Sequence, residues 1–248
     1  MKTSSKFFWI YFFFLTFFFA NILFLWIDQA LYEKYFFGED RIVEWLTFAG
    51  FFGAALTCII IIRKNYLCMS RWRFLYFIGF AIFFFVCAGE EISWGQRILG
   101  FHTPEVMVKY NHQQEFNIHN LELDFFHPRD IMGIYVYLYG IILPLFFFLR
   151  KSSSANTWQR FIYHPLITLC FIWTEILNFA RNPFCAYIRD KVTQTTFDLI
   201  INQIEESVEM YWAFSTLFGM IVIKNAWDYY AARKEEGVKS YERGQVCR

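Results

Sequence analysis

The sequence has none of the short motifs that identify the common metal and nucleotide enzymes. Its six cysteines form no C-x-x-C pair, so neither a zinc knuckle nor a disulfide framework is expected. Its five histidines form no H-E-x-x-H or H-x-x-x-H pair, the spacings that place two imidazoles on one helical face for zinc. It also has no glycine-rich phosphate loop, internal repeat or low-complexity linker. These absences predict one domain without a nucleotide site.

Charged residues are scarce at 18%, whereas 57% of the 248 residues are hydrophobic and 34 are phenylalanine. Such a composition is typical of a protein whose solvent is lipid. Six mostly apolar segments approach the roughly 20 residues that a helix needs to cross a bilayer. They lie near residues 7–27, 43–62, 74–93, 131–149, 161–179 and 205–223. We therefore predict an all-α, polytopic membrane bundle of six helices forming one domain over residues 1–248, with a tail at 224–248.

The basic residues are distributed unequally between the two sides of this predicted bundle. The N-terminal segment, the 63–73 and 150–160 loops and the tail hold 15 of the 23 Lys and Arg residues, but only four acids. The opposite side holds eight basic residues and 18 acids. Cytoplasmic loops of membrane proteins carry the excess of Lys and Arg. Both termini and the tail are thus predicted to be cytoplasmic, and the acidic side extracytoplasmic.

Two of the predicted outer segments contain helix signals. Thr103 as N-cap and Pro104 at the first helical position predict a short interfacial helix in the longest outer segment. In the last outer segment, apolar residues recur at helical spacing from Phe197 to Ile204, which predicts an amphipathic helix that enters the last span. Short interfacial helices are therefore expected on the outer side.

Polar residues fall on one face of each of three predicted helices at this outer end. If the third span stays helical through the stretch EEISWGQR, one face carries Glu90, Ser93, Trp94 and Arg97. The last span carries Asn202, Glu205, Glu209 and Trp212 on one face. In the fifth, Glu175, Asn178 and Asn182 line up, as do Thr174, Asn178 and Arg181. Charges near hydrocarbon are costly and normally turn inward, so the three faces predict a polar site. The alternative is a solvated boundary with Trp94 as an interfacial anchor.

Carboxylates and imidazoles suit both acid–base catalysis and a divalent metal. The predicted catalytic residues are Glu90, Glu91, Glu205, Glu209 and His119. The predicted substrate-binding residues are Ser93, Trp94, Arg97, Glu115, Asn178 and Arg181. A divalent metal is a candidate cofactor, with Glu90, Glu205 and His119 as candidate ligands. Glu115 and His119 share a face if their segment is helical. Glu91 points about 100° away from Glu90 on a helix, so Glu90 is expected to matter more.

The stretch from Glu90 to Asn120 also carries a recognisable pattern. E-E-x-S-W-G-Q-R at 90–97 is followed by T-P-E at 103–105 and by N-x-Q-x-E-x-N-x-H-N at 111–120. This pattern resembles that of a family of uncharacterised bacterial polytopic membrane proteins. The resemblance implies a protein of the bacterial inner membrane and singles out these positions, but it implies no particular reaction.

Three functions are compatible with these features. The leading one is an enzyme that hydrolyses or transfers groups on a lipid or lipid-linked head group at the extracytoplasmic leaflet. An ion- or proton-coupled transporter is the second, although the chain shows no repeated halves and no pair of spans broken by Gly or Pro. The third is a non-catalytic subunit of a membrane complex. The expected partners are a membrane lipid and a further membrane protein, with no nucleic acid.

Overall fold

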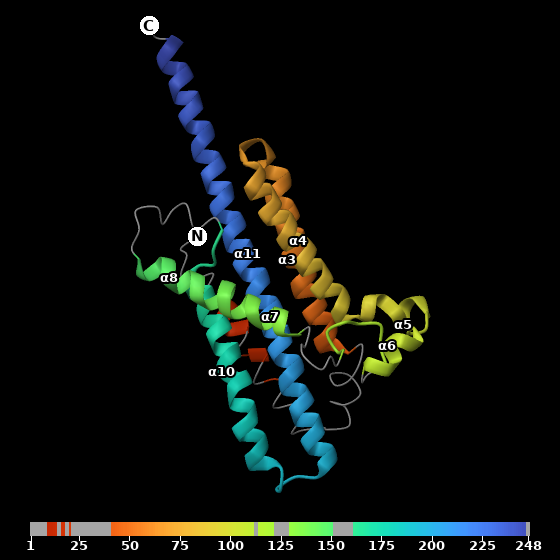
Figure 1. Ribbon diagram of the computed structural model, residues 1–248. Coiled ribbons are helices and arrows are strands. Elements are labelled where there is room, and N and C mark those ends of the chain that lie inside the picture. Colours follow the sequence, from red (N-terminus) through yellow and green to blue (C-terminus); the bar gives the residue numbers. More distant parts are fainter. Residues whose placement is uncertain are drawn as a thin grey trace.

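The computed structural model describes residues 9–13, 16–17, 20, 41–111, 114–121, 129–150 and 161–246 (Figure 1). Within them, all regular secondary structure is helical, and the one isolated bridge joins Asn111 to Leu121. The predicted all-α fold is thus confirmed. The elements are α3 (Ile42–Asn65), η1 (Tyr66–Cys68), α4 (Arg71–Glu91), η2 (Ser93–Gly95), α5 (Gln96–Leu99), α6 (Glu105–Tyr110), α7 (Arg129–Tyr135), the π-helical η3 (Val136–Ile142), α8 (Leu143–Leu149), α10 (Pro165–Ile188) and α11 (Gln194–Val246).

Within the described part of the chain, three helices are long and apolar enough to cross a membrane. They are α3, α4 and the continuous helix Arg129–Leu149 formed by α7, η3 and α8. They confirm the second, third and fourth predicted spans as candidate transmembrane helices. Most of the first predicted span lies outside the described residues, although 9–13, 16–17 and 20 are helical. The fifth and sixth are helical, as α10 and α11, but are not among these three.

The longest helix, α11, is the centre of the bundle. It packs against α3 and α10, while α4 packs on the far side of α3 (Figure 1). Gly50 of α3 lies so close to α11 that a Cβ there would be 2.8 Å from the Cβ of Ala213. Small residues at such crossings let two backbones approach, which is how helices gain packing energy in lipid. Replacing Gly50 with a larger residue would force α3 away from α11.

Aromatic side chains fill the space between these helices. Phe77, Phe84, Phe171 and Trp227 are almost completely buried, and the rings of Phe77 and Trp227 meet edge to face at 6.0 Å. Ring pairs of this kind contribute about 0.5–1.5 kcal/mol beyond the area they bury. The phenylalanines of the sequence therefore serve partly as core and not only as a lipid-facing surface.

Two helices depart from the predicted arrangement. Helix α11 has 53 residues, about 80 Å at 1.5 Å per residue, so it extends well beyond the bundle (Figure 1). The predicted tail is thus helical as far as Val246, with an ion pair of 2.7 Å between Lys224 and Asp228. The α7–η3–α8 helix runs across α10 and α11 in Figure 1. This course brings its first residue, Arg129, against α11.

Candidate functional site

Helix α4 ends at Glu91, so the prediction of a continuous helix as far as Arg97 is wrong. Ser93, Trp94 and Gly95 have φ angles of 46°, 55° and 73°, which places three consecutive residues in the left-handed region. For residues other than glycine, this conformation costs about 1–3 kcal/mol each. It therefore persists only because the surrounding contacts of Ser93 and Trp94 offset that cost.

The first of these contacts joins Trp94 to Glu90. The indole folds back over Gly89, where a Cβ would come within 2.9 Å of the ring, and its Nε1 donates to Glu90 Oε1 at 2.7 Å. Glu90 Oε2 accepts from the backbone N–H groups of Ile118 and His119, the latter at 2.9 Å. The imidazole Nδ1 of His119 lies 3.5 Å from the same oxygen. Glu90 thus holds the 118–119 backbone and the His119 ring against the end of α4.

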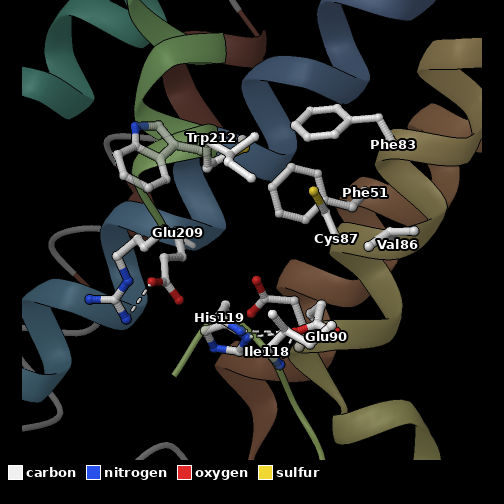
Figure 2. A pocket seen from close by; sticks show the side chains of 13 residues that line it. Phe51, Phe83, Val86, Cys87, Glu90, Ile118, His119, Glu209 and Trp212 are labelled. Atoms are coloured by element: carbon white, nitrogen blue, oxygen red, sulfur yellow. Dashed lines mark hydrogen bonds and ion pairs between the residues drawn. The ribbon is translucent and has the colours of Figure 1, made fainter. Parts of the chain in front are cut away.

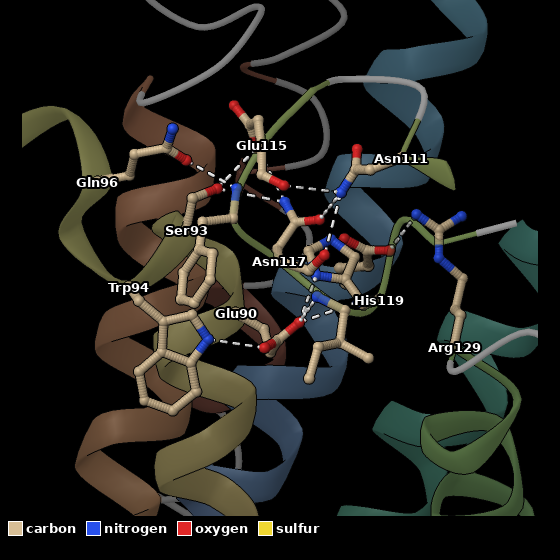
Figure 3. A network of polar contacts seen from close by, with 12 residues as sticks. Glu90, Ser93, Trp94, Gln96, Asn111, Glu115, Asn117, His119 and Arg129 are labelled. Atoms are coloured by element: carbon tan, nitrogen blue, oxygen red, sulfur yellow. Dashed lines mark hydrogen bonds and ion pairs between the residues drawn. The ribbon is translucent and has the colours of Figure 1, made fainter. Parts of the chain in front are cut away.

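The second group of contacts surrounds Glu115, which is 8% exposed (Figure 3). Its carboxylate accepts hydrogen bonds from Ser93 Oγ at 2.7 Å and Asn117 Nδ2 at 2.9 Å, and it pairs with Arg97. Asn111 Nδ2 donates to Asn117 Oδ1 at 2.7 Å. We call this set, Ser93, Arg97, Asn111, Glu115 and Asn117, the loop network. Its buried polar atoms are bonded chiefly to one another.

A third contact closes the loop on its outer side. Gln96 Nε2 donates to Thr103 Oγ1 at 2.7 Å, and Gln96 Oε1 accepts from the backbone of Phe116 at 2.7 Å. Thr103 Oγ1 in turn donates to the carbonyl of Gln114 at 2.7 Å. The short helix predicted here is confirmed as α6, but Pro104 rather than Thr103 is its N-cap. The Thr103 side chain holds the loop instead.

These contacts assign a structural role to several predicted site residues. Ser93, Trp94, Arg97 and Glu115 hold the 93–120 segment in place, and none of them lines the cavity described next. The helical pairing predicted for Glu115 and His119 is wrong, because residues 114–121 form bends and turns.

A cavity of about 270 Å³ lies beside this segment, between α3, α4, α7 and α11 (Figure 2). The labelled rings of Figure 2 lie toward one end of it, and the labelled acids and His119 lie toward the other, together with the aliphatic Ile118. The apolar lining consists of Phe51, Phe83, Val86, Cys87, Ile118, Ile131, Met132 and Trp212. The polar lining consists of Glu90, Glu91, His119, Arg129 and Glu209. Four of the five predicted catalytic residues therefore line one cavity.

The apolar lining differs in exposure from one part of the cavity to another. Phe51 and Trp212 are 2% and 6% exposed, whereas Val86, Ile118 and Ile131 are 39%, 51% and 49% exposed. The three exposed aliphatic residues lie on α4, the 114–121 segment and α7. The cavity thus has buried aromatic walls and an apolar rim on the surface of the protein.

The charges of the polar lining are only partly paired. Glu209 is 9% exposed and forms an ion pair of 2.9 Å with Arg129. Among the described residues, Glu91 accepts no hydrogen bond and forms no ion pair, although Glu209 and Glu206 lie within its electrostatic range. A carboxylate without a donor is the group that the surroundings stabilise least as an anion. Glu91 is therefore the carboxylate most available to a proton or a ligand.

The remaining predicted residues lie elsewhere. Glu205 pairs with Arg181 between α11 and α10, and neither side chain lines the cavity, nor does Asn178. Within the described part of the chain, no three His, Cys, Asp or Glu side chains are placed to hold a metal ion together. Glu90, Glu205 and His119 do not form a ligand set there, because Glu205 is bound to Arg181.

Arg129 was not predicted as a site residue, and Glu175 was predicted on the polar face of the fifth span but without its partners. Arg129 is the cation of the cavity, and it could have been noticed as a basic residue that directly precedes an apolar span on the acidic side. Glu175 receives hydrogen bonds from Trp212 Nε1 at 2.8 Å and Tyr137 Oη at 2.5 Å. It thereby orients the indole that forms one wall of the cavity. Nothing in the sequence pairs these three residues.

No protein-family model, curated protein or solved structure matches this chain. What the site does is therefore a question of its own geometry.

Proposed function

We propose that the protein is a membrane enzyme that hydrolyses, or transfers a group on, a membrane lipid whose head enters this cavity. The observation that carries the proposal is that one cavity combines an exposed aliphatic rim, buried aromatic walls, and carboxyl groups with an imidazole. A water-soluble substrate would gain little from an apolar rim. An amphiphile can keep its chain in the hydrocarbon while its head reaches the polar end.

The polar end has the groups that acid–base catalysis needs. Glu91, which accepts no hydrogen bond from the described residues, takes the proton from an attacking water or hydroxyl group. His119, held by Glu90, gives a proton to the leaving oxygen. General acid–base catalysis by such positioned groups contributes about 10²–10⁴-fold to a rate. This assignment gives Glu91 the role of base and makes Glu90 a positioning residue.

The shape of the cavity favours the enzyme over a transporter. Its apolar end stops at Phe51, Phe83 and Trp212, and beyond them the core is packed with buried rings such as Phe84. A carrier needs a route that reaches the opposite face in one of its states. A site that is open to one side suits a substrate that enters from the membrane and leaves by the same way. The inner-membrane location and the outward orientation of the cavity belong to the same proposal.

The experiment uses the full-length protein in liposomes made from a total bacterial lipid extract. Lipids are followed by mass spectrometry for the wild type, for Glu91→Gln and for Glu105→Gln. Glu105 is an exposed acid of α6 away from the cavity, so its variant is the matched control. We expect one lipid class to be converted by the wild type and the control, and at least about 100-fold more slowly by Glu91→Gln. Equal turnover by all three would refute the role of Glu91, and no turnover by the wild type would refute the enzyme.

A further inference from the structure

Acidic groups outnumber basic groups in the cavity lining. Among the described residues, three carboxyl groups line it, against one guanidinium and one imidazole: Glu90, Glu91, Glu209, Arg129 and His119. Glu206 adds a further carboxylate within electrostatic range of Glu91. An anionic head group that entered here would find the guanidinium of Arg129 already paired with Glu209, and would lie among acids.

Aromatic faces adjoin these acids. Trp212, Phe51 and Phe83 line the same cavity as these acids, with Phe83 the farthest of the three from Glu90 and His119 in Figure 2. The face of an aromatic ring attracts a cation, most strongly for Trp, and rings combined with a carboxylate are the usual recognition site for ammonium groups. This observation is independent of the acid count, because the rings would favour a cation even if one carboxylate were protonated. Rings and carboxylates thus select the same charge.

The size of the cavity limits what can enter. About 270 Å³ is slightly below the range of about 300–1,000 Å³ that is typical of pockets for drug-sized ligands. It accommodates a small head group and the first carbons of a chain, while the exposed rim of Val86, Ile118 and Ile131 adjoins the rest of the chain. We propose that the occupant of the cavity is an amphiphile with an amine or quaternary ammonium head group, held between Glu91 and the aromatic walls. This inference rests on the proposed function, because it names the substrate class of the same site.

The test compares three photoreactive probes with the same diazirine-bearing alkyl chain and different heads: trimethylammonium, hydroxyl and sulfonate. Each is incorporated in liposomes with the full-length protein and irradiated, and the labelled peptides are identified. We expect the ammonium probe to label the segment that contains Phe83 and Val86 about tenfold more than the sulfonate probe. Glu91→Gln should lower this labelling about tenfold, whereas Glu105→Gln should not change it.

Each other outcome has a defined meaning. Equal or stronger labelling by the sulfonate or hydroxyl probe overturns the ammonium head group, and this comparison needs only the wild type. Competition by free tetramethylammonium as effective as by the unlabelled long-chain amine identifies a soluble amine, which overturns the amphiphile. Turnover of an anionic lipid without ammonium labelling leaves the enzyme standing and removes this inference. Ammonium labelling without turnover of any lipid leaves the binding site standing and removes the catalysis.

Discussion

The loop network lies next to the polar end of the cavity, which we call the cavity floor. The two regions differ in how their carboxyl groups are paired. In the loop network, the one carboxylate, Glu115, accepts from two side chains besides its pair with Arg97. At the cavity floor, Glu91 accepts from none among the described residues, and the nearby groups include the acids Glu206 and Glu209. Polar groups buried with all their partners hold a fold in place. Polar groups buried without partners cost stability and are more often retained for function.

This difference separates residues that hold the fold from residues that line the cavity, although both kinds occur in the same stretch of sequence, EEISWGQR. Glu90 lies between the two regions, because its carboxylate is bound by Trp94 and by the 118–119 backbone and also lines the cavity. Glu91, the next residue, belongs only to the floor. The three predictions below test the comparison, beginning with the largest expected effect on stability.

The first prediction is that Glu115→Ala destabilises the protein strongly. It leaves Ser93, Asn117 and Arg97 without their shared acceptor in a largely buried place, at a cost of about 2–4 kcal/mol, lowered from the fully buried case because Arg97 is 40% exposed. Thermal unfolding in detergent should show a large drop in the midpoint. Glu105→Ala, which removes an exposed acid nearby, should change it little. Equal midpoints for the two variants would show that the loop network does not hold the fold.

The second prediction concerns the turn that carries the loop network. Gly89→Ala places a Cβ 2.9 Å from the Trp94 ring, so the ring must move and its hydrogen bond to Glu90 is strained. Overpacking of this kind costs about 1–3 kcal/mol. Gly79→Ala lies in the same helix with no atom within 4 Å of the new Cβ, so it should be neutral or gain up to about 1 kcal/mol. The two thermal midpoints should therefore move apart, and a common shift would contradict the contact.

Composition and hydropathy were sufficient to predict the all-α fold and the three helices that are apolar enough to span, because lipid permits few other solutions for so apolar a chain. They also predicted that Glu90, Glu91, Glu209 and His119 lie at one end of the fold. The turn at Ser93 and Trp94 could not be predicted, since helical periodicity assumes that the helix continues, and only the tertiary contacts of Glu90 and Glu115 offset its backbone cost. Arg129 was missed for a related reason: its partner Glu209 is 80 positions away on another helix.

The last prediction has the smallest expected effect and compares the adjacent acids Glu90 and Glu91. From the sequence, Glu90 was expected to matter more than Glu91. In the wild type, the two oxygens of Glu90 accept from Trp94, Ile118 and His119. The amide of Glu90→Gln has only one acceptor oxygen, so at least one of these N–H groups loses its acceptor. That loss costs about 1–2 kcal/mol. Glu91→Gln replaces a carboxyl group that accepts no hydrogen bond from the described residues and that lies in range of the acids Glu209 and Glu206 as well as of Arg129.

The stability of Glu91→Gln should therefore equal or slightly exceed that of the wild type, by up to about 1 kcal/mol. Thermal midpoints of the two isosteric variants, measured in the same detergent, check this order. Lipid turnover should fall in both variants, through misplacement of His119 in Glu90→Gln and through loss of the base in Glu91→Gln. A more stable Glu90→Gln, or a destabilised Glu91→Gln, would mean that Glu91 has a partner and that the boundary between the loop network and the cavity floor lies elsewhere.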